Sequence, residues 1–147
     1  MKRLFKFSAL LFLLFIGFSC SNDDDDPTPA PSPVIVTFDA VLTPVIRNGT
    51  NSSGSATLKL NQTAKTFDVM VTHSGIIPIK GYIRKADGTI VFSFPDASVS
   101  SIPIVWHFTI ADSQIEELMA NHYYIDLRTK AYPNGEISGT LIKSANG

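Results

Sequence analysis

Two short segments of the sequence place aromatic and charged residues at alternating positions. Tyr82 and Arg84 alternate in one segment, and Tyr124, Asp126 and Arg128 alternate in the other. Residues two apart on a β-strand share one face, so each segment would present its polar side chains together. A guanidinium group suits bidentate recognition of a carboxylate or a phosphate, and tyrosine rings supply stacking surface. These residue types predict an anion- or glycan-binding surface, and a solvated ion-pair network is the alternative.

Other residues offer little chemistry at a recognisable spacing. The single cysteine excludes an internal disulfide framework, a Cys-based zinc site and an iron–sulfur cluster. His73, His107 and His122 stand alone in their segments, so we expect hydrogen-bonded or solvated side chains and no metal site. Glu116 and Glu117 are neighbours in a predicted helix and point in different directions. The sequence has no Gly-x-Ser-x-Gly elbow and no phosphate-binding glycine loop. We therefore expect no enzymatic activity and no cofactor.

The first 19 residues are typical of a secretory signal peptide. Three basic residues precede an apolar run over 7–18, which is too short to span a bilayer because a span needs about 20 residues. The Gly-Phe-Ser-Cys junction at Cys20 resembles the lipobox of bacterial lipoproteins, in which the cysteine is acylated and becomes the new N-terminus. The resemblance implies a signal peptide over 1–19, export through the inner membrane, palmitate-type lipidation of Cys20 and membrane anchoring. An ordinary secretory signal followed by a free cysteine is the alternative.

Residues 20–33 are typical of a solvated tether. The four aspartates Asp23–Asp26 repel one another, and four prolines over 27–33 favour an extended chain. An acidic run directly after a lipobox cysteine resembles the surface-export signal of Bacteroidetes lipoproteins. This resemblance implies an outer-membrane lipoprotein that is exposed on the cell surface, and a plain soluble spacer is the alternative.

Residues 34–147 predict one folded β domain. Apolar and polar residues alternate over 34–42, 56–61 and 67–72, which is typical of half-buried strands. Further strands, separated by turn residues, are expected at 77–85, 89–94, 102–110, 122–129 and 136–143. The turn residues are Asn48-Gly49, Asn51 to Gly54, Asp87-Gly88 and Pro133-Asn134-Gly135. Residues 112–120 break the alternation and predict a short helix. About eight strands without a βαβ rhythm favour an antiparallel Greek-key β-sandwich or barrel.

Several residues of this domain carry local expectations. Ser113 and Glu116 fit a capping box at the start of the helix. Gly135 is expected at positive φ in a tight turn, and the carboxylate of Glu136 would accept backbone N–H groups there. Gly139 lies within a predicted strand, where glycine marks a bulge or a close backbone approach.

The C-terminal third of the chain carries a family resemblance. Residues 123–129, Tyr-Tyr-Ile-Asp-Leu-Arg-Thr, and 132–139, Tyr-Pro-Asn-Gly-Glu-Ile-Ser-Gly, resemble the closing motif of the CHRD domain, which is named after chordin and is widespread in secreted bacterial proteins. Earlier pieces also fit the domain: Phe38-x-Ala40-x-Leu42, Gly54-x-Ala56, Gly81 to Gly88, and Leu118. The resemblance covers nearly all of 34–147 and implies a non-enzymatic binding or interaction module.

The sequence departs from the family pattern at three positions. Many bacterial CHRD domains have His-x-His in the middle strand and a histidine before the threonine of the later strand. Tyr82, Arg84 and Arg128 stand at the matching positions. A guanidinium group offers donors only and would repel a cation, so we expect no metal at this place. A metal-dependent envelope enzyme on a β-sandwich and a structural surface lipoprotein are the alternatives to a binding module.

The CHRD-like arrangement would bring the two alternating segments together. Arg84 and Arg128 would approach each other, and Asp126 would be the nearest acid. We therefore expect Tyr82, Arg84, Tyr124, Asp126 and Arg128 to form a ligand-binding surface. The expected partners are the membrane, through the lipid anchor, and an extracellular protein or glycan. The formal net charge of -1 gives no reason to expect nucleic acid.

Overall fold

The computed structural model describes residues 28–46 and 51–145. The expected signal peptide over 1–19, Cys20, the acidic run Asp23–Asp26 and the turn at Asn48-Gly49 lie outside these residues. Residues 31–147 form one compact unit of the chain. Within the described ranges, no helix is long and apolar enough to cross a membrane.

The described part of this unit is built almost entirely from strands. In chain order the elements are β1 (Ile35–Pro44), β2 (Ser53–Asn61), β3 (Thr66–Ser74), β4 (Lys80–Lys85), β5 (Ile90–Ser93), β6 (Ile104–Thr109), α1 (Asp112–Met119), β7 (Tyr123–Arg128), β8 (Ile137–Thr140) and β9 (Ile142–Lys143). The all-β class with one short helix is thus confirmed. The strand expected at 136–143 is divided in two, because Leu141 is fully buried and its N–H donates to the carbonyl oxygen of Tyr123 at 2.9 Å.

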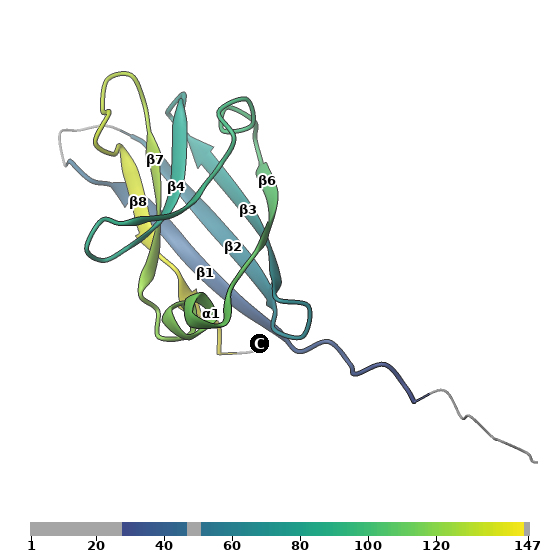
Figure 1. Ribbon diagram of the computed structural model, residues 1–147. Coiled ribbons are helices and arrows are strands. Elements are labelled where there is room, and N and C mark those ends of the chain that lie inside the picture. The colour runs from purple at the N-terminus through teal and green to yellow at the C-terminus, as the bar shows by residue number, and fades with distance from the viewer. Residues whose placement is uncertain (1–27, 47–50, 146–147) are drawn as a thin grey trace, which may run out of the picture. The chain divides into compact units, whose positions relative to one another are not determined.

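The strands form a curled antiparallel sheet, a half-barrel, in the order β5-β4-β7-β8-β1-β2-β3-β6 across the described residues (Figure 1). Neighbours in this order are often distant in the chain, as Greek-key connections require. β1 links the two halves of the sheet, because it pairs with β2 along most of its length and with β8 at its end, where Thr43 lies opposite Ser138. The short β9 also pairs with β1.

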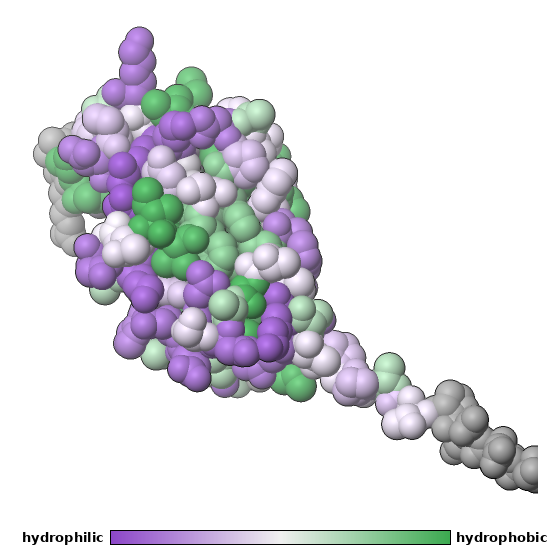
Figure 2. All heavy atoms as spheres, in the orientation of Figure 1, coloured by the Kyte–Doolittle hydropathy of each residue, from purple (hydrophilic) through white to green (hydrophobic). Residues whose placement is uncertain are grey.

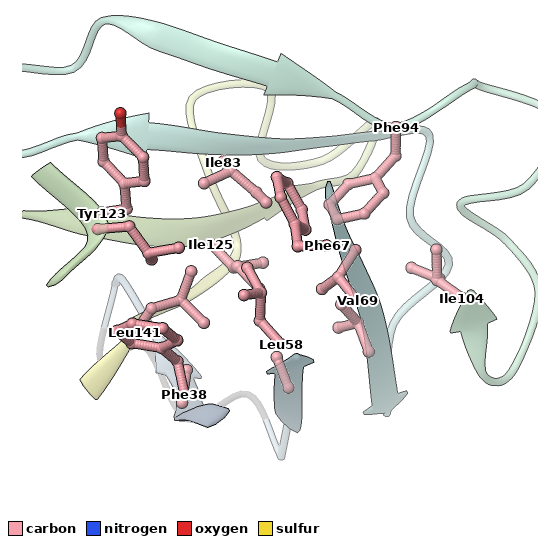
Figure 3. Packing of buried hydrophobic residues seen from close by; sticks show 14 of the residues in the cluster. Phe38, Leu58, Phe67, Val69, Ile83, Phe94, Ile104, Tyr123, Ile125 and Leu141 are labelled. Atoms are coloured by element: carbon pink, nitrogen blue, oxygen red, sulfur yellow. The ribbon is translucent and has the colours of Figure 1, made fainter. Parts of the chain in front are cut away.

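Alternation along the strands determines which side chains fill the half-barrel. Phe38 of β1 and Leu58 of β2 point toward Ile83 of β4 and Ile125 of β7 across the core (Figure 3). All four side chains are buried, and the residues between them in sequence lie on the outer face of the sheet. Burial of this apolar face is the main stabilising contribution to the fold.

Aromatic side chains bridge the two edges of the sheet. Phe92 of β5 and Phe108 of β6 have ring centroids 5.2 Å apart, and Phe92 also meets Phe67 of β3 at 4.9 Å. Aromatic pairs at these separations contribute beyond their buried area. In Figure 2, hydrophobic side chains gather near the middle of the view, where β4 is drawn in Figure 1.

The start of the helix differs from the expected capping box at Ser113 and Glu116. The N-cap is Ala111, two residues earlier, and the side chain of Gln114 accepts a hydrogen bond from the N–H of Ala111 at 3.0 Å. Ser113 therefore lies inside the first turn. The capping pattern in the sequence placed the N-cap two residues too late. It missed Ala111 because an alanine carries no side-chain acceptor and does not fit a capping pattern. Leu118, which is fully buried, anchors the helix on the core.

Tyr123 supplies a test of this core. Its ring is buried, and its hydroxyl has no hydrogen-bond partner among the described residues. Tyr123→Phe keeps the ring and removes the unpartnered oxygen, so we expect the free energy of unfolding to rise by about 1 kcal/mol at pH 7. Urea denaturation followed by the fluorescence of Trp106 measures this change. A clear loss of stability would mean that the hydroxyl has a partner in solution.

The same variant should change the response to alkaline pH. Burial, and secondarily the charge of Glu117, raise the pKa of the Tyr123 hydroxyl above its ordinary value of 10.0. The unfolded chain then loses this proton at lower pH than the folded chain, so the native protein is destabilised as pH rises above about 10. We expect this alkaline loss of stability to be smaller in Tyr123→Phe.

Candidate functional site

The register of two neighbouring strands brings together the residues that the sequence singled out. β4 and β7 pair antiparallel, with Tyr82 opposite Asp126 and Arg84 opposite Tyr124. Arg128 follows Asp126 by two residues and shares its face. The intervening residues of β7 face the core. All five predicted side chains therefore lie on the outer face of the sheet.

Tyr82, Arg84, Asp126 and Arg128 form a tight cluster, which we call the arginine cluster. Nε of Arg128 donates to Oδ2 of Asp126 at 2.9 Å, and Nε of Arg84 lies 3.8 Å from the same oxygen. The guanidinium carbons of Arg128 and Arg84 lie 5.1 Å and 5.7 Å from the centroid of the Tyr82 ring, within reach of cation–π attraction. Two cations share one carboxylate, so the cluster keeps one excess positive charge.

The two arginines are held differently. Arg128 has a second bond, from Nη1 to the carbonyl oxygen of Pro133 at 3.0 Å, which ties β7 to the loop that follows it. Nε of Arg84 is buried and has no hydrogen-bond partner within the described residues. Arg128 is therefore a structural tie, whereas Arg84 is held by charge and by the Tyr82 ring.

Asp126 is buried although it lies on the outer face. Its side chain is only 4% exposed, and its Oδ1 has no hydrogen-bond partner in the part of the chain that the structure describes. Gly135 lies beside this oxygen, because a Cβ at that residue would come within 3.0 Å of Oδ1. Burial of a charged oxygen with spare lone pairs costs free energy. Asp126 is thus fixed in place by Arg128, and it keeps one buried carboxylate oxygen without a partner among the described residues.

A groove of about 590 Å³ runs over β7, β8 and β1 on the same face, and we call it the outer groove. Its polar lining residues are Thr43, Tyr124, Asp126, Asn134, Ser138 and Thr140. Tyr124 and Asp126 therefore belong to the groove, whereas Tyr82, Arg84 and Arg128 are not among its lining residues. The predicted site is divided into a groove and an arginine cluster, and Asp126 belongs to both.

Sequence reasoning missed the hydroxyl side chains of the groove. Ser138 and Thr140 alternate in the last predicted strand, which is the signal that could have found them. Register places Asp126 opposite Ser138, and Ser138 opposite Thr43. The pairing of β8 with the end of β1 gave no signal in the sequence, so Thr43 could not be assigned to this surface.

The loop between β7 and β8 covers Asp126. Gly135 adopts φ +127°, which confirms the expected positive φ, and its N–H donates to the carbonyl oxygen of Tyr132 at 3.1 Å. The expectation that Glu136 accepts backbone N–H groups is wrong. Its carboxylate accepts the hydroxyl of Thr129, which in turn accepts the N–H of Tyr132 at 3.2 Å. A side-chain hydroxyl of suitable reach thus takes the place of the backbone donors.

Gly139 confirms the expected close backbone approach. A Cβ at this residue would lie 2.2 Å from the carbonyl oxygen of Val41, which is far inside any real contact. The lack of a side chain lets β8 approach β1, and both residues line the outer groove.

The three histidines have separate partners. Nε2 of His73 lies 3.2 Å from the carbonyl oxygen of Ser101, and His107 contacts Asp68 at 2.8 Å. Nδ1 of His122 lies 3.0 Å from Glu117, and this contact, together with a nearby lysine, lowers the pKa of the Glu117 carboxyl. Within residues 28–46 and 51–145, no three histidine, cysteine, aspartate or glutamate side chains gather to hold a metal.

The fold and the site define an antiparallel β half-barrel with a polar groove on its outer face. The CHRD domain matches this chain over residues 38–141, and the chain therefore belongs to the CHRD domain family. The matched segment includes the strands that carry the arginine cluster and the outer groove. Membership indicates an extracellular-type domain. Comparisons with curated proteins and with solved structures gave no match.

The unequal anchoring of the two arginines predicts unequal effects on stability. Arg128→Ala removes a charge-assisted hydrogen bond to a buried carboxylate and the tie to Pro133, so we expect a loss of about 2 kcal/mol. Arg84→Ala removes a longer ionic contact and one cation–π contact, so we expect a loss of about 0.5–1 kcal/mol. Urea denaturation of both variants checks this difference. Equal losses would contradict the structural role assigned to Arg128.

Proposed function

We propose that this protein is a lipid-anchored protein of the bacterial cell envelope whose CHRD domain binds a ligand at the outer groove without transforming it. The binding role rests on one observation, the Asp126 side chain. It lies in the groove wall, contacts two guanidinium groups, and keeps one carboxylate oxygen without a hydrogen-bond partner among the described residues. Such a buried, incompletely paired charge opposes stability, so its presence in the groove wall supports a functional role for this surface.

Binding is favoured over catalysis by the way the groove residues are engaged. A serine or threonine hydroxyl attacks a substrate only with a neighbouring base that takes its proton. Ser138 lies opposite Asp126 in the register, but no hydrogen bond joins the two side chains among the described residues, and Oδ2 of Asp126 accepts a bond from Arg128. The hydroxyl groups that line the groove are therefore suited to hydrogen bonding with a ligand rather than to attack on it.

The anchor is supported by the order of segments in the sequence. A basic start and a short apolar run lead to Cys20, and an acidic, proline-rich stretch follows before the first strand. In this proposal Cys20 carries the lipid, and Asp23–Asp26 direct the protein to the outer surface of the outer membrane. Two acyl chains would hold it more firmly than one, since a single chain gives only marginal binding.

Replacement of the lipidated residue tests the anchor. We expect Cys20→Ser to abolish labelling with a palmitate analogue and to move the protein from the membrane fraction to the soluble fraction, or to leave the precursor unprocessed. Ser21→Ala is the matched control and should be labelled and fractionated as the unmodified protein. Normal membrane fractionation and labelling of Cys20→Ser would contradict the lipoprotein assignment.

A bulky side chain in the outer groove tests the binding role. Thr43 is exposed and lines the groove without contacting the arginine cluster, so Thr43→Tyr should fill the groove and leave the fold intact. Met70, exposed on the outer face of β3 and outside the groove lining, provides the control Met70→Tyr. Both variants, purified as the mature chain with Cys20→Ser, are used as bait for cell-envelope material and culture medium.

We expect Thr43→Tyr to capture several-fold less material than either the unmodified bait or Met70→Tyr, measured as total bound mass. Equal capture by all three baits would contradict a binding role for the outer groove.

A further inference from the structure

The outer groove runs along the strands. Val41, Thr43 and Val45 alternate along one side of it, and four residue steps of extended chain span about 13 Å. Its volume of about 590 Å³ falls within the range of about 300–1,000 Å³ that is usual for small-molecule sites. These dimensions suit an extended molecule of about two or three small rings better than a single ion.

Polar side chains form rows across this groove. Asp126, Ser138 and Thr43 face one another across three strands, and Tyr124 lies opposite Thr140 in the next row. A hydroxyl group both donates and accepts hydrogen bonds, and the ring of Tyr124 offers a flat apolar surface. A sugar ring has the complementary surface, because its hydroxyl groups lie around the edge and its C–H groups lie on the faces.

The charges around the groove disfavour an ionic ligand. Asp126 is the one charged residue among the described residues that line the groove, so it opposes an anion there even though the arginine cluster as a whole keeps one excess positive charge. Arg84 and Arg128 contact Asp126 from outside the groove lining, and they would repel a cation. An uncharged ligand with hydroxyl groups avoids both repulsions, and it can form hydrogen bonds with the hydroxyl groups of Thr43, Ser138 and Thr140.

We infer that the outer groove binds an uncharged glycan, with the hydroxyl groups of Thr43, Ser138 and Thr140 forming hydrogen bonds to the ligand and Tyr124 stacking on a sugar ring. This inference rests on the proposed binding function and names its ligand class. Arg128 is a positioning residue, since it fixes Oδ2 of the carboxylate that lies opposite Ser138 in the groove wall.

Calorimetry and an oligosaccharide array test the inference with the mature Cys20→Ser chain. The probes are neutral hexose and N-acetylhexosamine oligosaccharides, compared with matched oligosaccharides that carry uronic acid or sulfate. We expect neutral probes to bind, and the affinity to change less than about twofold between about 0.05 M and about 0.5 M NaCl, because no ion pair is formed. Tyr124→Ala should weaken binding by roughly three- to tenfold, and Tyr124→Phe, which keeps the ring, should not.

Thr43→Tyr should also abolish binding of the neutral probes. If Tyr124→Ala lowers the melting temperature, so that weaker binding could come from a destabilised fold, the result with Thr43→Tyr decides the test. Binding of charged oligosaccharides alone, with strong salt dependence, would overturn the inference and move recognition to the arginine cluster. If no oligosaccharide binds while Thr43→Tyr still reduces capture from envelope material, the glycan inference fails and the proposed function stands. If Thr43→Tyr affects neither measurement, both fail.

Discussion

The close approach of β8 to β1 at Gly139 is the contact on which the rest of the structure depends. The carbonyl oxygen of Val41 lies where a side chain at residue 139 would begin, so only glycine allows the two strands to meet there. This contact joins β5, β4, β7 and β8 to β1, β2, β3 and β6 in one curled sheet. The curl encloses the core on one face. On the other face it places the hydroxyl groups of β8 between Asp126 and Thr43, which creates the outer groove.

Asp126 shows how stability and recognition compete at this junction. The carboxylate is buried on the face of the sheet that is otherwise polar and partly exposed, and it is paired on one oxygen only. Removal of a buried charged partner costs more than a buried pair contributes, so the Arg128 contact chiefly prevents the penalty of an unpaired charge. The loop from Thr129 to Glu136 covers the carboxylate of Asp126. The polar groups of this loop bond one another and not Asp126, since Glu136 accepts the hydroxyl of Thr129 and Thr129 accepts the N–H of Tyr132.

Alternation in the sequence was sufficient to predict the strands and their faces, because burial on one side of a sheet imposes a period of two on the side chains. Alternation also placed Arg84 on the same strand face as Tyr82, and Asp126 on the same strand face as Tyr124. Strand order is different in kind, since it depends on contacts between residues far apart in the chain. The pairing of Thr43 with Ser138, and with it the outer groove, left no local pattern. The helix cap was misplaced for a related reason: Gln114 supplies the reciprocal bond to an alanine, which no capping pattern includes.

The arginine cluster also shows how one scaffold position can hold different chemistries. In CHRD domains with the histidine pattern described above, the matching side chains would come from the same positions of β4 and β7. The register here brings all three positions together, with both guanidinium groups within 5.7 Å of the Tyr82 ring. Imidazole groups at such positions could share a cation, because each offers a lone pair. Guanidinium groups offer only donors, so they instead surround the carboxylate of Asp126 and fix its orientation. The backbone determines that these side chains meet, and the residue types determine that the result is an oriented acceptor beside a groove.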